Sequence, residues 1–134
     1  MKKRSFKRSA KHLKRTPFRV KKERRYFGNI ESEYRGVIYR SRAEMHYAMW
    51  LDSEVKRNML KGWKYEVNTE LIINDKKICN VMWDFLLTFK DGHKEFHEMK
   101  GYKTAVFRLK EKMFRALNPN LQLKIIDSKN WSHG

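Results

Sequence analysis

The sequence has little of three things that often narrow a function class: cysteine, long apolar runs and negative charge. Its single cysteine, Cys79, excludes an internal disulfide and indicates a reducing compartment. No apolar run approaches membrane-spanning length, and no apolar segment follows the basic N-terminus, which argues against a secretory signal. The sequence therefore predicts a cytoplasmic protein with no membrane partner.

Acidic residues number 15 against 32 Lys and Arg, so the formal net charge is +17. An excess of this size indicates a polyanionic partner, and nucleic acid is the commonest one. A basic structural protein of the ribosomal kind would show the same excess. The length of 134 residues allows one domain, and an aromatic content of 13% is enough for a compact core.

The positive charge is concentrated at the N-terminus. Residues 1–25 contain 13 Lys or Arg and one acid, Glu23, which leaves a formal charge of +12. Such a segment repels itself too strongly to fold alone, so we expect residues 1–28 to be a flexible, nearly sequence-blind nucleic-acid-binding arm. A solubilising or localising tail is the alternative. The arm residues expected to contact DNA include Lys14, Arg15, Lys21, Lys22, Arg24 and Arg25.

Residues 80–100 predict a β-hairpin that contains three notable ionisable side chains. Residues 81–89 are rich in aromatic and branched side chains, and residues 94–100 alternate in polarity, as expected of two strands. The Asp91-Gly92 pair between them is typical of a tight turn. The ionisable residues are Asp84 in the first strand and Glu98 and Lys100 in the second.

The length of the loop decides whether these side chains meet. Glu98 and Lys100 share a face, because residues i and i+2 of a strand point the same way. A two-residue loop would turn Asp84 away from Glu98. A three-residue loop over residues 90–92, with Gly92 in the left-handed region, would set Asp84 opposite Glu98 with their Cβ atoms roughly 5 Å apart.

Two adjacent carboxylates repel each other, and a hard divalent cation such as Mg²⁺ removes that conflict by accepting their oxygens as ligands. Lys100, next along the same face, could then contact a metal-bound water or a phosphate. The alternative is an amphipathic hairpin with a solvated Glu-Lys pair. Asp84 favours the metal site, because it interrupts an apolar strand in which an unpaired charge would be costly.

A short strand over residues 37–39 precedes a predicted helix that begins after Ser41 and runs to about Leu60, with Gly62 ending it. Ser41 and Glu44 form the S-x-x-E pattern of a capping box. Two interpretations of Glu44 follow: its carboxylate folds back onto the Ser41 backbone, or it points toward the hairpin. Spacing alone favours the cap.

The remaining residues of this helix divide into a core face and a surface. An apolar stripe at helical spacing predicts the core face, whereas His46 and Tyr47 are interpreted as surface or rim residues. The stripe consists of Ala48, Leu51, Val55 and Met59.

The rest of the chain adds two strands and a second helix. Residues 63–73 predict a strand that ends in an Asn74-Asp75 turn, and residues 121–126 predict the last strand. Thr104 is expected to cap a helix that extends to about Leu117. The expected core stripe of that helix is Val106, Leu109, Met113 and Leu117.

The resulting order, α-β-β-β-α-β, predicts an α/β fold in which helices flank a mixed sheet. We expect this domain to span residues 29–128, with a polar tail over residues 129–134. Glu66 and Glu70 would share a face of the 63–73 strand. One of them could lie at the edge of the site, although the sequence favours solvated positions for both.

The motifs resemble the PD-(D/E)XK nuclease superfamily, whose active-site hairpin contains an Asp followed by Glu-x-Lys. Asp84 and Glu98-Met99-Lys100 match that pattern, although Trp83 replaces the proline that often precedes the aspartate. The segments Y-R-S-R-A-E (39–44) and H-E-M-K-G-Y-K-T (97–104) look more specifically like small phage-encoded endonucleases with likeness to Holliday-junction resolvases. Phage head-completion nucleases share a similar opening and are the alternative.

The resemblance implies a restriction-endonuclease-like core and a metal-dependent DNA endonuclease that acts on branched DNA in phage recombination or packaging. Asp84 and Glu98 would bind Mg²⁺ or Mn²⁺, with the Met99 carbonyl as a further ligand, and Glu44 would complete the shell, which tips its interpretation toward the site. Lys100 would position or activate the attacking water. The residues expected to hold DNA outside the arm are Lys103, Lys110 and Arg42.

Resolvases of this superfamily act as homodimers, so a homodimer is implied as well. The host-cell cytoplasm would be the compartment of a phage-encoded resolvase, and the virion that of a head-completion nuclease. A non-catalytic basic nucleic-acid-binding protein, in which the hairpin acids are structural, is the alternative from another class.

Overall fold

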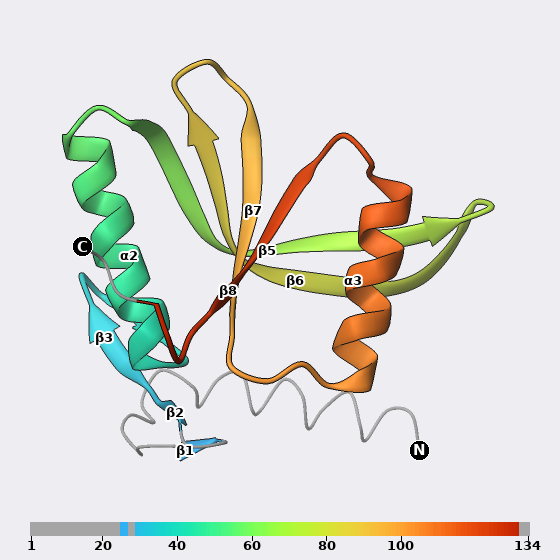
Figure 1. Ribbon diagram of the computed structural model, residues 1–134, viewed down its shortest axis with the longest axis horizontal. Coiled ribbons are helices and arrows are strands. Elements are labelled where there is room, and N and C mark those ends of the chain that lie inside the picture. Colours follow the sequence, from blue (N-terminus) through green and yellow to red (C-terminus); the bar gives the residue numbers. More distant parts are fainter. Residues whose placement is uncertain (1–24, 27–28, 132–134) are drawn as a thin grey trace, which may run out of the picture.

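The computed structural model describes residues 25–26 and 29–131, and its centre is a four-stranded mixed sheet between two helices (Figure 1). The strand order is β5-β6-β7-β8, antiparallel except for the parallel β7–β8 pair. The predicted α/β class with a mixed, helix-flanked sheet is confirmed. The elements are β1 (Arg25–Tyr26), β2 (Asn29–Ile30), β3 (Ser32–Tyr34), β4 (Val37–Tyr39), α2 (Arg42–Lys56), β5 (Leu60–Ile73), β6 (Lys76–Phe89), β7 (Lys94–Lys100), α3 (Ala105–Leu117) and β8 (Gln122–Asp127).

Helix α2 begins as the sequence predicts and ends earlier. The Ser41 hydroxyl accepts a hydrogen bond from the Glu44 N–H at 3.1 Å, which caps the first turn. The helix stops at Lys56, because Asn58 adopts a left-handed conformation with φ of 65°. Asparagine tolerates that conformation better than most residues and ends helices for this reason. The predicted extension to Leu60 is therefore wrong, and Leu60 and Gly62 lie in β5.

Strands β5 and β6 form one long hairpin. Its turn is Asn74-Asp75, where both residues have positive φ, 51° and 64°. Two left-handed residues in succession make the turn that fits the twist of a two-residue hairpin, and Asn and Asp favour it. The predicted turn is confirmed, but β6 begins at Lys76, earlier than expected.

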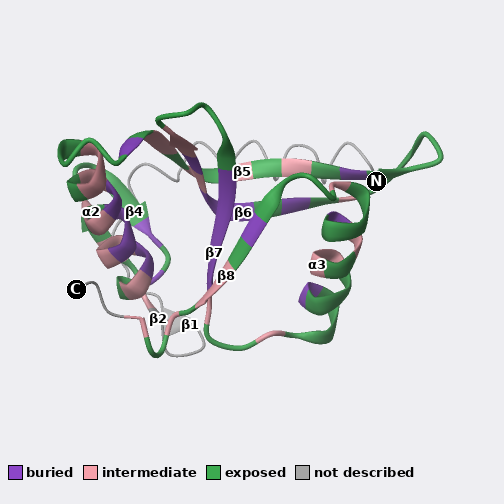
Figure 2. Cartoon of the chain, turned by 45° about the horizontal axis from the view of Figure 1, so that its top comes forward, coloured by how far each residue is buried: buried purple, intermediate pink, exposed green. Residues whose placement is uncertain are grey.

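The sheet has a separate core on each face. Side chains from neighbouring positions of one strand enter different cores: Phe85 packs with α2, whereas Leu86 packs with α3. Strand β7 lies between these cores, and its residues 95–99 are all buried, as Figure 2 shows. Polar side chains on β7 are therefore withdrawn from solvent whichever face they occupy.

Helix α3 turns a different face to the sheet from the one its aliphatic stripe predicts. Phe107 and Phe114 are buried against Trp83, with ring centroids 6.1 and 5.0 Å away. Val106 and Leu109 are 62% and 57% exposed. The predicted core stripe of α3 is wrong for Val106, Leu109 and Leu117, whereas Met113 packs against this core as predicted. Two aromatic rings two turns apart bury more apolar surface than the aliphatic side chains beside them.

Tyr47 is also buried rather than a surface residue. Its ring is 2% exposed, and its hydroxyl lies 2.6 Å from His97 Nδ1 on β7. Trp131 packs its ring against Tyr47 at 5.0 Å between centroids, so the start of the predicted polar tail lies on α2.

The N-terminal arm lies mostly outside the described residues. Lys14, Arg15, Lys21, Lys22 and Arg24 are not described, whereas Arg25 lies in β1. Among the helices that the structure describes, none has both the length and the apolar character needed to cross a membrane.

Candidate active site

The loop between β6 and β7 sets the register that places Asp84 beside Glu98. The Phe89 N–H donates to the His93 carbonyl at 2.9 Å, and the Gly92 N–H donates to the Phe89 carbonyl at 2.9 Å. Gly92 has φ of 94°, in the left-handed region. The loop is thus the three-residue form over residues 90–92, the one of the two possible lengths that sets Asp84 opposite Glu98, and the ladder pairs Phe85 with His97.

At the next position of the ladder, carboxylates replace backbone carbonyls as acceptors. The Asp84 N–H donates to Glu98 Oε1 at 3.0 Å, and the Met99 N–H donates to Asp84 Oδ2 at 2.9 Å. Asp84 and Glu98 are only 1% and 6% exposed. The two strands open at this point, and the two acids fill the opening.

The β5 strand is also irregular at the level of Asp84. Tyr65 pairs with Phe85 and Val67 with Trp83, so Glu66 lies opposite Asp84. Glu66 has φ of 57°, a conformation that non-glycine residues adopt at a cost. At this irregularity the side chains of β6 change faces of the sheet. Phe85 packs in the α2 core, whereas Trp83, two residues earlier, packs in the α3 core. Figure 1 shows β5 and β6 bending near the middle of the sheet.

Helix α2 directs Glu44 into the same region. The Glu44 N–H is bonded to the Ser41 hydroxyl, but its carboxylate accepts a hydrogen bond from the Tyr65 hydroxyl at 2.5 Å. The backbone of Glu44 therefore belongs to the helix cap, while its side chain faces the hairpin. The interpretation in which the Glu44 carboxylate folds back onto the Ser41 backbone is therefore wrong, because that carboxylate contacts Tyr65 and Arg40.

Arg40 lies next to three acids, Asp84, Glu44 and Glu66, and sequence reasoning missed it. Its Nη2 lies 2.6 Å from Asp84 Oδ1, and its Nε lies 3.7 Å from Glu44 Oε1 and 3.4 Å from Glu66 Oε2. The Arg40 side chain remains 54% exposed. Buried carboxylates need a nearby positive charge, and this need is the signal that could have identified Arg40.

Lys100 lies beside Glu98, as the strand parity predicts. Its Nζ is 3.6 Å from Glu98 Oε2 and 4.3 Å from the centroid of the Phe107 ring, over its face. The aromatic ring and the carboxylate both attract the ammonium, and they hold Lys100 at the edge of the acid cluster.

The pKa values of these groups follow from burial and from each other. Burial raises the pKa of Asp84 to about 8, and the neighbouring Glu98 and Glu44 add to the shift. Burial raises the pKa of Glu98 to about 7 despite the opposing effect of Lys100. Burial would lower the pKa of Arg40, but Glu44 and Asp84 raise it above its ordinary value. An additional cation at this position would favour the ionised form of both acids.

The site opens to a groove of about 1080 Å³. Its lining includes Arg40, Arg42, Glu44, Asp84, Glu98, Met99 and Lys100. Carboxylate oxygens are the ligands that Mg²⁺ and Mn²⁺ prefer, so the donor set fits a hard divalent cation. Within the described part of the chain, no three acidic, imidazole or thiol side chains form a ready-made metal cage. The Arg40 guanidinium instead provides the positive charge next to Asp84 and Glu44.

The predicted DNA-contacting residues occupy different places. Arg42 is exposed at the start of α2 and lines the groove. Lys103 is paired with Glu111 at 3.1 Å, and Lys110 donates to the Asn80 carbonyl at 3.4 Å, on the side of α3 next to β6. Only Arg42 therefore lines the groove among these three.

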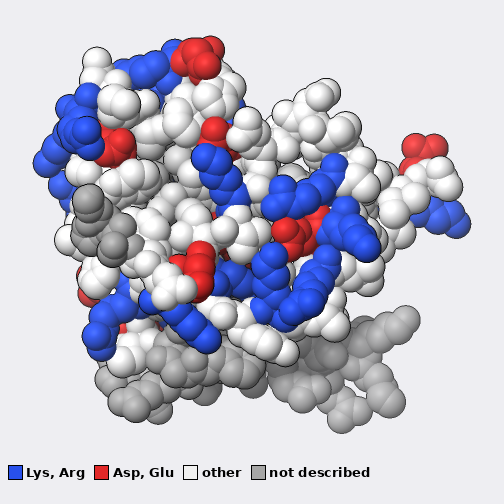
Figure 3. Space-filling view, in the orientation of Figure 1, with Lys and Arg blue, Asp and Glu red and all other residues white. Residues whose placement is uncertain are grey.

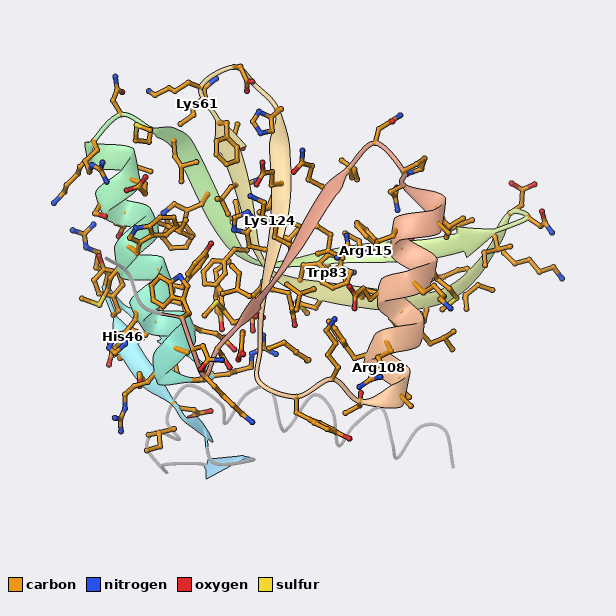
Figure 4. The ribbon with its side chains drawn as sticks, in the orientation of Figure 1. His46, Lys61, Trp83, Arg108, Arg115 and Lys124 are labelled. Carbon is orange, nitrogen blue, oxygen red and sulfur yellow. The ribbon has the colours of Figure 1, made fainter. Side chains whose placement is uncertain are left out.

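A band of positive charge crosses the face drawn in Figure 3, over α3 and β8. Figure 4 labels three of its members, Arg108 and Arg115 on α3 and Lys124 on β8. Arg115 and Lys124 have side chains 46% and 58% exposed. Sequence reasoning did not select these three residues as DNA contacts.

Comparison with known proteins yields one match. No curated protein and no solved structure matches the chain. Residues 24–133, most of the chain and all of the described site, match a family of proteins of unknown function designated DUF1064. The chain therefore belongs to the DUF1064 family.

Proposed function

We propose that this protein is a metal-dependent endonuclease that hydrolyses phosphodiester bonds in DNA. The observation that supports the proposal most strongly is the meeting of Asp84 and Glu98 through reciprocal hydrogen bonds, with Lys100 Nζ 3.6 Å from Glu98. Two buried carboxylates and an adjacent ammonium at an open groove are suited to hold a divalent cation and a phosphate.

Asp84 and Glu98 would hold the cation, with Glu44 and the Met99 carbonyl as further ligands in this proposal. A bound Mg²⁺ would lower the pKa of a water molecule and stabilise the negative charge that develops on the phosphate. Lys100 would orient the attacking water or contact a phosphate oxygen, because its ammonium lies at the open edge of the cluster.

DNA as the substrate is supported by charge. The whole chain has a formal net charge of +17, and the band that includes Arg108, Arg115 and Lys124 presents part of it on one face. Contacts of this kind bind the phosphate backbone without reading sequence. The preference for branched DNA rests on the resemblance to resolvases described above.

The test is cleavage of three substrates, a four-way junction, a linear duplex and a single strand, each with Mg²⁺ or with EDTA. Junction-selective cutting that requires Mg²⁺ supports the proposal in full. Unselective metal-dependent cutting supports a nuclease of the trimming or head-completion kind. Binding without cutting, in the presence of Mg²⁺ or Mn²⁺, would show a non-catalytic DNA-binding protein and end the proposal.

A further inference from the structure

Arg40 occupies the position next to the acids where a bound cation would also have to lie. Its guanidinium contacts Asp84 Oδ1 at 2.6 Å and lies 3.7 Å from Glu44 Oε1. Both oxygens belong to the carboxylates that would hold a divalent cation. The structure thus places a positive charge of the chain itself beside these two acids.

Arg40 and a divalent cation compete for Asp84 Oδ1. The Arg40 guanidinium nitrogen at 2.6 Å occupies one of the two lone-pair directions of this oxygen, and a metal ligated by it would lie roughly 2.1 Å away. Two positive charges that close together would repel each other strongly in a partly buried site. Metal binding therefore favours a position of the Arg40 side chain away from Asp84.

The position of Arg40 on the chain allows such a movement. It lies between the end of β4 and the Ser41 cap of α2, so its backbone belongs to neither element. Its side chain is 54% exposed, whereas that of Asp84 is 1% exposed. A rotation of the side chain alone would bring the guanidinium into the groove that it already lines.

A guanidinium released into this groove matches one ligand chemistry above others. Arginine binds phosphate oxygens through paired N–H groups, more specifically than lysine does. A phosphate of the DNA backbone next to the metal would therefore replace the carboxylates as the partner of Arg40.

We propose that Arg40 exchanges between the acid cluster and a phosphate of the DNA, and thereby makes metal binding and DNA binding mutually dependent. This inference rests on the proposed nuclease function. Each ligand removes what opposes the other: the metal frees Arg40 for DNA, and the phosphate keeps Arg40 away from Asp84. By thermodynamic reciprocity, DNA then raises the affinity for metal by the same factor as metal raises the affinity for DNA.

The first test is the affinity of the full chain for Mn²⁺ alone, measured by isothermal titration calorimetry at constant pH and salt. Arg40→Gln is expected to bind Mn²⁺ on the order of tenfold more tightly than the wild type, because the competing ion pair is gone. Two control variants remove the same charge elsewhere. Arg42→Gln removes it from the same groove without touching Asp84. Arg57→Gln removes it from the far end of α2, where Arg57 pairs with Glu54 at 2.6 Å. If Arg40→Gln binds Mn²⁺ no more tightly than Arg42→Gln, the inference is wrong.

The second test uses the unmodified side chain and so does not depend on how a variant folds. Phenylglyoxal labelling followed by mass spectrometry reports how accessible Arg40 is. Its modification is expected to rise several-fold from EDTA to saturating Mn²⁺, and to fall again when a four-way junction is added. Labelling of Arg40 that ignores Mn²⁺ would overturn the exchange.

These outcomes separate the inference from the proposed function. If DNA is cut with Mg²⁺ but Arg40 neither competes with Mn²⁺ nor changes its labelling, the nuclease proposal stands and the exchange fails. If Arg40 competes and changes its labelling but no DNA is cut, the exchange of cations stands and the nuclease proposal fails.

Discussion

Asp84 and Glu98 hold each other in place through the backbone of the opposite strand. Glu98 Oε1 accepts from the Asp84 N–H at 3.0 Å, while Asp84 Oδ2 accepts from the N–H of Met99, the residue after Glu98, at 2.9 Å. Each acid therefore has one oxygen committed to the hairpin and one directed elsewhere, Asp84 Oδ1 to Arg40 and Glu98 Oε2 to Lys100. A site held in this way is preorganised, because its side chains need not be ordered when a ligand arrives.

This arrangement predicts opposite effects of Asp84→Asn on activity and on stability. Cutting in Mg²⁺ is expected to fall by at least about a hundredfold, since a carboxylate ligand is lost. The melting temperature is expected to stay the same or rise, because the amide oxygen still accepts from Met99 and the repulsion with Glu98 is relieved. Cleavage assays and circular-dichroism melts measure the two effects.

Asp75→Asn is the matched control for that substitution. Asp75 lies at the tip of the β5–β6 hairpin with φ of 64°, a conformation that asparagine also tolerates. It should change neither cutting nor the melting temperature. A clear drop in the melting temperature of Asp84→Asn, with this control unchanged, would show that the Asp84 charge stabilises the fold.

The raised pKa values predict a stability that declines with pH when no divalent cation is present. Because burial raises the pKa of Asp84 to about 8 and that of Glu98 to about 7, the folded chain binds protons that the unfolded chain has released. The stabilisation from this protonation is complete below the unfolded value near 4 and is lost as pH rises through 7 and 8.

The measurement is the difference in melting temperature between the wild type and Asp84→Asn, in EDTA, from pH 5 to pH 8.5. The wild type should lose on the order of 10 °C relative to the variant over that range. Saturating Mg²⁺ should abolish the difference in slope, since the cation replaces the proton. If the melting temperatures of the wild type and the variant changed equally with pH in EDTA, both acids would be able to ionise in the folded protein without destabilising it.

The local geometry of the hairpin was predictable because a few residues decide it. Gly92 permits the left-handed conformation that a three-residue loop needs, and strand parity then fixes Asp84 beside Glu98. The caps at Ser41 and Thr104 follow from short-range chemistry in the same way.

The position of Arg40 was not predictable, since it depends on how β4 meets the bend in the sheet. That bend is centred on Glu66, whose left-handed conformation no sequence pattern indicates. The buried face of α3 was mistaken for a related reason. Its aromatic and aliphatic side chains lie on adjacent faces of one helix, and only the position of Trp83 decides which face is covered.

The face of α3 can be tested by two substitutions in one helix. Phe114→Ala should lower the free energy of unfolding by about 3–5 kcal/mol, because the ring is 2% exposed and packs on Trp83 and Phe96. Leu109→Ala should change it by less than about 0.5 kcal/mol, because that side chain is 57% exposed. Urea unfolding of both variants gives the comparison. Equal losses would place the aliphatic stripe in the core instead.

The role of Lys100 is tested by separating cutting from binding. Lys100→Ala should reduce cutting by about a hundredfold or more, because the ammonium that lies 3.6 Å from Glu98 at the edge of the groove is removed. DNA affinity, measured by fluorescence anisotropy in EDTA, should change less than about threefold, since one of many cations is lost. Lys94→Ala, exposed at the other end of β7, is the control and should cut as the wild type does. A loss of affinity as large as the loss of cutting would make Lys100 a DNA anchor, and the attacking water would then have to be oriented by another group.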